Sequence, residues 1–501
     1  MLMSGVGEKI DSLFIEKRAF IDGCYVAAVN GDVISKVSPV DGRDLTGVAA
    51  CDQEDVNFAV AAALQSFDKG EWANKLPRDK KRILLAFADL IELHREELAL
   101  LDTVETGRAY QNYYDDSIPK AIEALRYFAE SVDKLYDSAV TPGPEAFSTI
   151  VREPLGVVAL ITPWNDPMVV SMWKIAPALL MGNSIVIKPA EQSSFSILRV
   201  AALAKEAGIP AGVFNVVPGH GEVAGKALAL HRDVSGIFFT GSSETGKKML
   251  EYSGQSNMKK VALECGGKSA FLVSKHCSDL EVAARTLADS MFYNQGQICS
   301  APSRAIIAEE VKDEFISILL TMLDDYVPAD PFNPENSIGC VVSAVQQGKI
   351  NQYIDEGVAS GLKVYRSRPA KGMSNESCYV LPAVFVDDNE GSPIAQEEIF
   401  GPVLLVMGAT TMREAVRKAN NTRYGLAASI WTNDLNEAHW VSRNLRAGIV
   451  HVNCYGDDDN TAPFGGIKES GIGKDKSIFA FDDYSELKTV WVRYEPSFDA
   501  D

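Results

Sequence analysis

The 501-residue sequence predicts an α/β fold with two α/β units in series and a few small outlying strands. From about Val151 onward, short apolar runs alternate with stretches of helical periodicity, which is typical of parallel sheets covered on both faces. The apolar runs are nearly continuous, as expected for buried strands. A chain of this length also exceeds what one compact core supports, so two or three domains are expected.

The region 53–135 is predicted to be helical. Within it, Leu84, Phe87, Ala88 and Ile91 recur at helical spacing, and charged residues occupy the other faces. This pattern predicts amphipathic helices that precede the alternating part of the chain.

Four predicted strands, each followed by a helix, form the first unit. They are the runs 156–164, 184–190, 212–219 and 234–242, with helices near Ala176, through Ala202, from Glu222 and from Glu244. A second set begins at Ser269, with strands at 269–273, 304–310, 383–387 and 401–408, and residues 484–492 have the pattern of an edge strand. Because ligands bind at the carboxyl ends of such strands, we expect a single cleft there.

The composition excludes several classes of function. A formal net charge of −20 argues against a nucleic-acid partner and against anionic membrane surfaces. No apolar run reaches the roughly 18 residues of a membrane span, and the N-terminus lacks the apolar segment of a signal peptide. The eight cysteines show neither CxxC pairs nor zinc-type spacing, which favours reduced thiols in the cytoplasm. No two of the six histidines have metal-ligand spacing, so no metal is expected.

Cys299 is the candidate nucleophile. A lone cysteine is more often a buried structural thiol, and that alternative stays open from the residue alone. The segment NQGQICS favours a reactive role, because Asn294, Gln295 and Gln297 are an unusual lining for an apolar core. A reactive cysteine needs an accessible, polar environment that stabilises its thiolate.

Two further polar residues follow apolar segments. Glu264 ends the run VALE before Gly266 and Gly267, where it is either a surface carboxylate or a general base that activates water. Asn165, in ITPWNDP, either caps the next helix or donates its side-chain NH₂ to a developing oxyanion together with a backbone N–H.

Two loops have the character of cofactor sites. Lys188 and Glu191 come directly after a predicted strand, where both are able to bind vicinal ribose hydroxyls. Gly241 and Gly246 lie at a strand-to-helix turn, where helix N–H groups face a phosphate. Glycine loops alone are a weak indication, and this one is not a GxGxxG fingerprint.

Together these segments resemble one family. The segments TPWN, KPAEQ, FTGS, LECGGKS, NQGQICS, QEEIFGPV and TAPFGGIKESGIG stand in the order and at about the separations found in the NAD(P)-dependent aldehyde dehydrogenase superfamily. The resemblance extends from about Phe20 to Val492. It implies a Rossmann-like NAD-binding domain (1–135 and 155–266) and a catalytic domain (267–467), both doubly wound. A small β oligomerisation segment (136–154 and 476–501) would complete the fold.

The resemblance also implies a mechanism. The Cys299 thiolate attacks the aldehyde carbon, and Asn165 with the Cys299 N–H holds the oxyanion of the thiohemiacetal. Hydride transfer leaves a thioester, which water activated by Glu264 hydrolyses. Lys174 and Asp475 resemble the family's proton-relay pair, and a purely structural ion pair is the alternative.

For the cofactor, the resemblance places Lys188 and Glu191 at the adenosine ribose and Glu398 and Phe400 beside the nicotinamide ribose. The dinucleotide groove is lined by Trp164, Gly225, Thr240, Gly241 and Ser242. Because the Glu191 carboxylate accepts a ribose 2′-hydroxyl but repels a 2′-phosphate, NAD is favoured over NADP.

The substrate tunnel differs from that of relatives that oxidise simple aldehydes. By resemblance, Asp116, Asp166 and Asp458 fall at tunnel positions, with Asp457 and Asp459 nearby, while Trp173 and Tyr293 form aromatic walls. Unpartnered carboxylates in a tunnel imply a cationic substrate. The C-terminal segment also resembles aminoaldehyde dehydrogenases of polyamine and arginine catabolism, including the γ-glutamyl-γ-aminobutyraldehyde and 4-guanidinobutyraldehyde enzymes.

Several alternatives stand beside the aminoaldehyde hypothesis. In the first alternative, the aspartates are loop residues that face solvent, and the enzyme oxidises uncharged aliphatic aldehydes. A catalytically silent structural relative is disfavoured because Cys299, Glu264 and Asn165 are all present, and a CoA-acylating relative is disfavoured by Glu264. The resemblance implies a homodimer or homotetramer. Lys474 replaces the usual arginine and puts those subunit contacts in doubt, because lysine lacks the arginine fork. Cys265 in the LE-x-GGK motif is expected to be tolerated.

Overall fold

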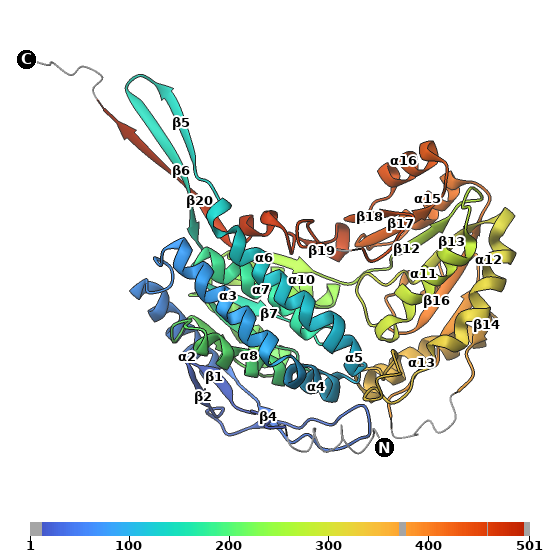
Figure 1. The fold of residues 1–501 in the computed structure, drawn as a ribbon, viewed down its shortest axis with the longest axis horizontal. Helices are drawn as coiled ribbons and strands as arrows, with labels where there is room; N and C mark the ends of the chain where they lie inside the picture. Colours follow the sequence, from blue (N-terminus) through green and yellow to red (C-terminus); the bar gives the residue numbers. More distant parts are fainter. Residues whose placement is uncertain (1–12, 370–376, 458, 495–501) are drawn as a thin grey trace, which may run out of the picture.

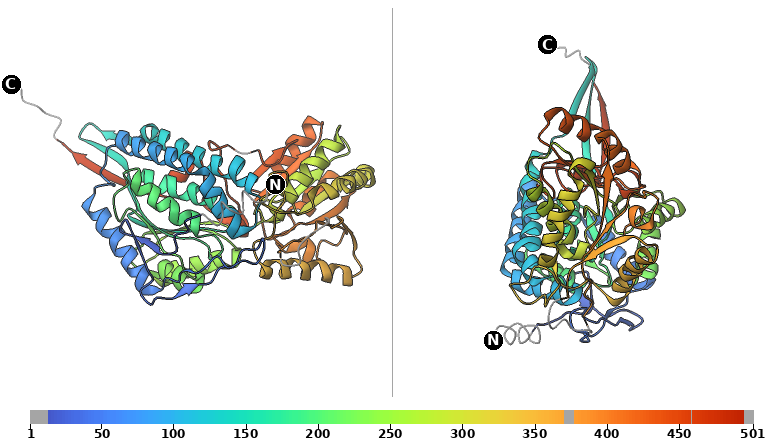
Figure 2. Two further views of the ribbon diagram at one scale, coloured as in Figure 1. Left: turned by 60° about the horizontal axis from the view of Figure 1, so that its bottom comes forward. Right: turned by 90° about the vertical axis from the view of Figure 1, so that its right-hand side faces the viewer.

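The computed structural model describes residues 13–369, 377–457 and 459–494. Two α/β lobes lie side by side, and a three-stranded sheet projects from one of them (Figure 1). The N-terminal half of the chain forms most of the first lobe, and the segment after β12 forms most of the second (Figures 1 and 2). The predicted fold class is confirmed.

The first lobe is built on an eight-stranded sheet. The order is β19 (Gly471–Ile472), β11 (Lys260–Glu264), β10 (Gly236–Thr240), β7 (Val157–Ile161), β8 (Ser184–Lys188), β9 (Phe214–Val216), β1 (Ala19–Ile21) and β2 (Cys24–Val26). The five strands from β11 to β9 are parallel, while β19 and β1 join antiparallel at either side and β2 pairs antiparallel with β1. The four strands predicted for the first unit are confirmed, but the short edge strands β1 and β2 were not predicted.

Helices cover both faces of this sheet (Figure 1). They are α2 (Gln53–Lys69), α3 (Pro77–Leu93), α4 (Arg95–Thr106), α5 (Tyr110–Asn112), α6 (Ile118–Ser131), α7 (Pro167–Met181), α8 (Phe195–Glu206), α9 (Lys226–Leu230) and α10 (Ser243–Gln255). A π-helical turn, η1 (Tyr113–Ser117), joins α5 to α6, and another, η3 (Gly221–Gly225), precedes α9. The predicted helical character of region 53–135 is confirmed.

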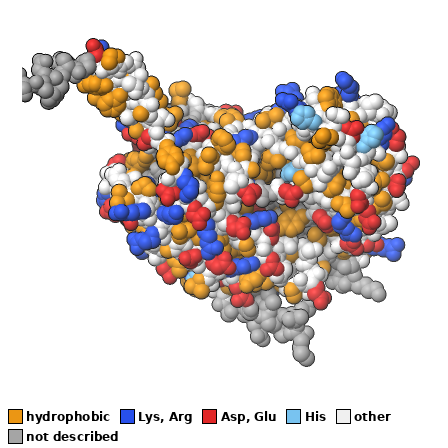
Figure 3. Space-filling model, turned by 45° about the horizontal axis from the view of Figure 1, so that its top comes forward, with side chains coloured by type: hydrophobic (Ala, Val, Ile, Leu, Met, Phe, Trp, Pro, Cys, Tyr) orange, Lys and Arg blue, Asp and Glu red, His pale blue; other side chains and the backbone are white. Residues whose placement is uncertain are grey.

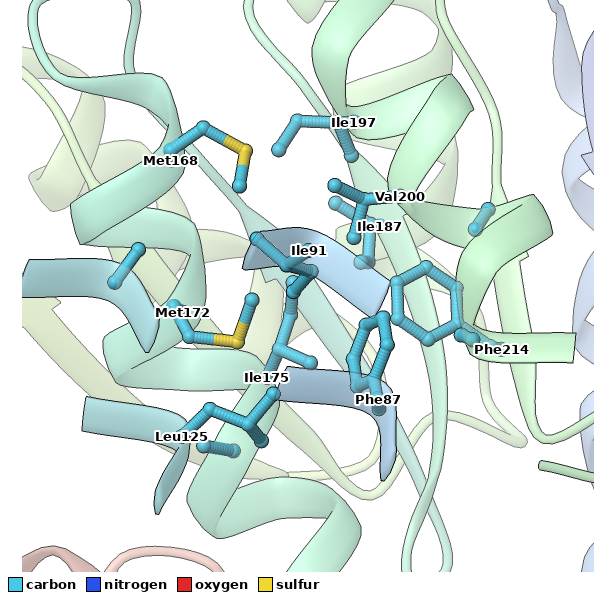
Figure 4. Close-up of a cluster of buried hydrophobic side chains, with 14 of the residues drawn as sticks. Phe87, Ile91, Leu125, Met168, Met172, Ile175, Ile187, Ile197, Val200 and Phe214 are labelled. Carbon is cyan, nitrogen blue, oxygen red and sulfur yellow. The ribbon is translucent and has the colours of Figure 1, made fainter. Parts of the chain in front are cut away.

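The core of the first lobe lies between the sheet and α3, α6, α7 and α8. Figure 4 shows Phe87 and Ile91 of α3 against Ile187 of β8 and Phe214 of β9, with Met172 of α7 close by. All five side chains are buried. Burying each of these side chains contributes on the order of 1.5–3 kcal/mol, which holds α7, and with it the loop after β7, against the sheet.

The second lobe contains a seven-stranded sheet. Its order is β14 (Lys363–Arg366), β15 (Ala383–Val386), β16 (Val403–Ala409), β13 (Arg304–Ala308), β12 (Ala270–Val273), β17 (Ala427–Trp431) and β18 (Ile449–Val452). All pairs are parallel except β14 with β15. The helices are α11 (Leu280–Phe292), α12 (Glu309–Met322), α13 (Ala344–Ala359), α14 (Pro393–Gln396), α15 (Met412–Asn420) and α16 (Leu435–Asn444). Strands β12, β13, β15 and β16 were predicted, whereas β14, β17 and β18 were not.

The projecting sheet has the order β20 (Ser485–Arg493), β6 (Ala146–Pro154) and β5 (Ser138–Gly143), all antiparallel. Strand β20 is an edge strand, as predicted. A two-stranded ribbon, β3 (Val33–Ile34) with β4 (Val48–Ala49), lies near the N-terminus. The domain boundaries stay a prediction. In the described part of the chain, no helix combines the length and the apolar character needed to cross a membrane.

Candidate active site

A cavity of about 200 Å³ gathers many of the residues singled out from the sequence. Its lining includes Trp164, Asn165, Trp173, Thr240, Gly241, Ser242, Glu264, Cys299, Glu398, Phe400 and Asp475. The first lobe contributes the residues up to Glu264, and the second lobe contributes Cys299, Glu398 and Phe400. The expected cleft at the carboxyl ends of the strands is therefore present.

The register of the first sheet explains why these residues meet. Strands β8, β7, β10 and β11 are parallel neighbours, so their carboxyl ends lie at one edge. Lys188, Thr240 and Glu264 are the last residues of β8, β10 and β11, and Asn165 follows β7 by four residues. Residues spread over 100 positions of sequence, from Asn165 to Glu264, are thereby brought to one sheet edge.

The Cys299 loop is held by its polar side chains, which are buried rather than facing the thiol. The Gln295 side chain donates to the Val380 carbonyl at 3.1 Å, and the Gln297 side chain accepts from the Val342 N–H at 3.0 Å. Asn294 and Gln295 have φ of 47° and 55°, a strained conformation that these bonds maintain. These polar side chains, which favoured a reactive cysteine in the sequence, bind backbone groups and shape the loop.

The Cys299 thiol is partly exposed to the cavity. Burial raises its pKa to about 12, and the nearby carboxyl groups of Glu398 and Glu264 add to the shift. The expectation of a thiolate-stabilising environment is therefore not met in this structure. Attack on a carbonyl requires that a base remove the thiol proton.

Asn165 does not cap a helix. Asp166 holds the N-cap position of α7, and Pro167 begins the helix. The Asn165 side-chain NH₂ instead donates to the Gln297 carbonyl at 3.1 Å, and its own carbonyl accepts from the Asn294 side chain at 3.0 Å. These two bonds place the Asn165 amide directly beside the loop that carries Cys299.

Glu264 is buried, so the alternative of a surface glutamate is wrong. Its side chain ends β11 with 6% exposure, and neither carboxylate oxygen has a hydrogen-bond partner among the residues that the structure describes. Burial and the neighbouring Asp475 raise the pKa of Glu264 well above its ordinary value. A side chain at Gly465 would place its Cβ 2.3 Å from the Glu264 carboxylate, so the glycine keeps this space open.

Lys174 and Asp475 form a buried ion pair with an N–O distance of 2.7 Å. Asp475 lines the cavity, and Lys174 lies behind it on α7. Their geometry fits both the proton-relay and the structural alternatives. Lys474, beside them, donates to the Gly465 and Gly466 carbonyls, so this lysine supports the glycine segment next to Glu264.

One end of the cavity has the features of a dinucleotide site. Gly241 and Ser242 directly precede α10, with Ser242 as its N-cap, and the Thr240 hydroxyl is buried without a partner in the described residues. Trp164 and Phe400 face each other edge-on with ring centroids 5.3 Å apart. Helix N–H groups suit a phosphate, and the aromatic pair suits a planar ring, so these residues fit a nicotinamide dinucleotide.

Glu398 stands opposite this helix end. It accepts a 3.0 Å hydrogen bond from the Gly267 N–H, and burial raises its pKa to about 7. A Cβ at Gly266 would lie 1.9 Å from its carboxylate, so the backbone here leaves room only for that group.

A second cluster lies further along the sheet edge. Lys188 and Glu191 form an ion pair of 3.3 Å, and the Gly221 N–H donates to Glu191 at 2.6 Å. Gly225 lies beside this cluster, because a Cβ built there would be in van der Waals contact with the Lys188 side chain at 3.7 Å. Burial opposes the charged form of Glu191, but Lys188 and these backbone bonds lower its pKa overall. A carboxylate is thus present where a ribose was predicted to bind.

Two of the three predicted tunnel aspartates, Asp116 and Asp166, have cationic partners. Asp166 accepts a 2.9 Å hydrogen bond from Arg108, and Asp116 pairs with Lys120 at 2.7 Å. The premise that these two carboxylates lack a cationic partner is therefore not met, although Asp166 Oδ1 is buried without a hydrogen-bond partner among the described residues, and a substrate cation at this site stays a prediction. Trp173 lines the cavity, whereas Asp116, Asp166 and Tyr293 form a cluster around Arg108 next to Asn165. Asp458 lies outside the described residues.

Arg108 is the residue that the sequence analysis missed. It follows Gly107 after α4, and no local pattern marks it, because its partners lie directly before α7, on η1 and directly after α11. Only the fold brings these elements together.

The family model for the aldehyde dehydrogenase family matches residues 25–490. The chain belongs to this family. This chain is 43% identical over 488 residues to the NADP/NAD-dependent aldehyde dehydrogenase PuuC of Escherichia coli. The match covers 97% of this chain and 98% of the relative. The chain is also 43% identical to the aminoacetaldehyde dehydrogenase of Pseudomonas aeruginosa, covering 96% of each.

Solved structures agree with this assignment. The γ-glutamyl-γ-aminobutyraldehyde dehydrogenase of Burkholderia cenocepacia superimposes with a TM-score of 0.95 at 45% identity, covering 99% of this chain and 100% of that one. The indole-3-acetaldehyde dehydrogenase AldA of P. syringae, in complex with NAD+ and IAA, has a TM-score of 0.96 at 43% identity, covering 98% and 99%. The enzyme described here is thus an NAD(P)-linked aldehyde dehydrogenase, as the sequence predicted.

Proposed function

We propose that this aldehyde dehydrogenase oxidises a cationic aminoaldehyde to its carboxylic acid with NAD, through a covalent intermediate on Cys299. The observation that carries the chemistry is the shared cavity, in which Cys299, Asn165 and Glu264 come together from two lobes. Their residue types supply a nucleophile, an oxyanion donor and a base.

The first step is attack of the Cys299 sulfur on the aldehyde carbon. Because the pKa of the thiol is raised, its proton has to leave as the sulfur attacks, and water that reaches the partly exposed Cys299 would accept it, which leaves the Glu264 carboxylate free for the later hydrolysis. The oxygen that becomes negative is stabilised by the Asn165 NH₂ and the Cys299 N–H. Mutagenesis of such donors in other enzymes costs roughly 10²–10³ in rate.

The second step removes the aldehyde hydrogen as hydride, which the nicotinamide of bound NAD accepts, and leaves an acyl thioester on Cys299. Trp164, Ser242, Glu398 and Phe400 would hold the nicotinamide half of the cofactor. Glu264 then takes a proton from water, whose oxygen attacks the thioester and releases the acid. Lys174 and Asp475 would carry that proton away from Glu264.

The Glu191 carboxylate supports NAD over NADP. It is fixed by Lys188 and by the Gly221 N–H, so it is not free to turn away from an incoming 2′-phosphate. A negative charge held near that phosphate opposes its binding.

The aminoaldehyde substrate is supported by two observations. Relatives with 43% and 45% identity are named for aminoacetaldehyde and γ-glutamyl-γ-aminobutyraldehyde. Asp457 and Asp459 are exposed on the segment that leads to Phe464, which lines the cavity. Carboxylates at an entrance raise the local concentration of a cationic substrate.

A second candidate is an uncharged aldehyde. Trp173 and Phe464 pack with ring centroids 5.0 Å apart on the cavity wall, and Val170 lies beside them. Asp166 and Asp116 already have cationic partners, so this part of the site does not require a positive substrate. The relative named for indole-3-acetaldehyde is 43% identical to this chain.

The two candidates differ in a matched pair of substrates. We would measure kcat/KM for 4-aminobutanal and for butanal in the wild type, in Asp457→Asn and in Asp115→Asn, an exposed aspartate away from that segment, as the control. A preference for 4-aminobutanal that decreases only in Asp457→Asn supports the aminoaldehyde. Equal values for the two substrates in all three proteins would favour the uncharged aldehyde.

The projecting sheet supports a homodimer or homotetramer. Its strands expose Val140, Phe147, Leu487, Val490 and Trp491, and hydrophobic side chains are visible on this arm in Figure 3. An exposed sheet with apolar side chains and a free edge is suited to pairing with a second copy.

All eight cysteines are free thiols, which supports a reducing compartment such as the cytoplasm.

A further inference from the structure

Arg108 is a buried cation at the boundary between the two lobes. Its side chain is 1% exposed, and the guanidinium lies between the rings of Tyr113 and Tyr293, 4.8 and 4.7 Å from their centroids. Gly107, directly before it, accepts from the Cys340 N–H at 2.7 Å, which fixes the Arg108 backbone against the second lobe.

The two ends of the guanidinium bind different catalytic segments. Nη1 donates to Asp166 Oδ2 at 2.9 Å, and Asp166 is the residue after Asn165. Nη2 donates to the Tyr293 hydroxyl, and Tyr293 begins the turn that leads to Cys299. One planar side chain therefore joins the Asn165 segment to the Cys299 segment.

The partners of Arg108 are themselves held in place. The Tyr293 hydroxyl donates to Asp116 Oδ2 at 2.9 Å, and Ser117 donates to Asp166 Oδ2 at 3.2 Å. Lys120 in turn pairs with the other oxygen of Asp116. The two positive charges and two negative charges of this cluster cancel, so it adds no net charge to the site. What it provides is the fixed geometry of its side chains.

We propose, on the basis of the roles assigned above to Asn165 and Cys299, that Arg108 is a positioning residue for oxyanion stabilisation. It sets the position of the Asn165 amide relative to the Cys299 sulfur by holding Asp166 and Tyr293 at once. A planar fork with separate donors suits this role, whereas a lysine ammonium at this position cannot hold both partners in the same way.

The proposal makes a specific kinetic prediction. A misplacement of about 1 Å costs roughly 100-fold in rate, so Arg108→Met is expected to lower kcat by about that factor. Because oxyanion stabilisation acts in the transition state, KM for the aldehyde and the dissociation constant of NAD should not change. Lys120→Met is the control, since it removes a cation of the cluster that contacts neither segment.

A double-variant cycle separates positioning from a general structural role. Arg108→Met is made in the wild type and in Asn165→Ala, and kcat is compared at a temperature below every unfolding midpoint. If Arg108 acts through Asn165, its replacement costs much less kcat in the Asn165→Ala background. An equal loss of kcat in both backgrounds would overturn the proposal.

Two more variants keep the test decisive if Arg108→Met folds poorly. Tyr293→Phe removes only the hydroxyl that accepts from Arg108, and Arg108→Lys keeps the charge but not the fork. Both should lower kcat and both should show the same dependence on Asn165, whereas full activity in both would refute the proposal. If Asn165→Ala alone retains full kcat, the proposed oxyanion role of Asn165 is wrong. That outcome differs from an equal loss of kcat in both backgrounds, which would overturn only the proposal for Arg108.

Discussion

The Lys174 ammonium and the Asp475 carboxylate form a 2.7 Å ion pair beside Glu264, with almost no exposure to solvent. These two residues shift the pKa of Glu264 in opposite directions, since Asp475 raises it and Lys174 lowers it. Burial is the main reason that the pKa of the proposed base is raised, and the ion pair adjusts that pKa, whatever its part in moving protons.

The pair predicts opposite changes in the pH profile. In Lys174→Met, the unpaired Asp475 raises the pKa of Glu264 further, so the pH at which kcat increases moves up. In Asp475→Asn it moves down. Either single change should also lower stability, on the order of 3–5 kcal/mol, because it leaves one buried charge without its partner. Measuring kcat against pH together with the unfolding midpoint checks both effects, and an unchanged pH profile in both variants would contradict this coupling to Glu264.

We expect the raised pKa of Glu398 to make the free energy of unfolding of the enzyme depend on pH. Its folded pKa is raised to about 7 from 4.5, so its stabilising contribution is complete below pH 4.5 and is lost as the pH rises through 7. Replacing it with the uncharged isostere in Glu398→Gln should therefore stabilise the enzyme at pH 8 by up to roughly 3 kcal/mol relative to pH 4.5. Urea unfolding of both proteins at the two pH values checks this, and an equal difference at both would contradict it.

Glu191 predicts the choice of cofactor. In Glu191→Gln the negative charge is gone while an acceptor oxygen remains, so kcat/KM for NADP should increase, by roughly tenfold for a repulsion of about 1.4 kcal/mol. The value for NAD should decrease slightly. Parallel assays with both cofactors measure this, and an unchanged ratio would mean that the Glu191 carboxylate lies away from the 2′ position.

Much of this site could be predicted from the sequence because its parts follow apolar strands. Thr240 and Glu264 end strands that are apolar and continuous, so the parallel sheet and its active edge follow from the pattern. The strands β17 (AASIW) and β18 (IVHV) were missed because small or polar residues interrupt their apolar runs. The Arg108 cluster was missed because its four segments meet only in the folded chain.

The polar residues before Cys299 show a different limit. Their residue types were read correctly as unusual for a core, but their function was not. Asn294 and Gln295 stabilise a strained turn by binding backbone groups, and composition does not distinguish that role from lining a reactive thiol. The direction of a side chain depends on φ values that the residue type does not fix.

The proposed mechanism depends on a thioester on Cys299, which water activated by Glu264 hydrolyses. The most direct measurement is mass spectrometry of Glu264→Gln mixed with NAD and butanal, with NADH followed in the same reaction. We expect one rapid burst of NADH, slow turnover and an acyl group on the peptide that contains Cys299. A burst with no adduct on Cys299, or steady turnover as fast as the wild type, would contradict the mechanism.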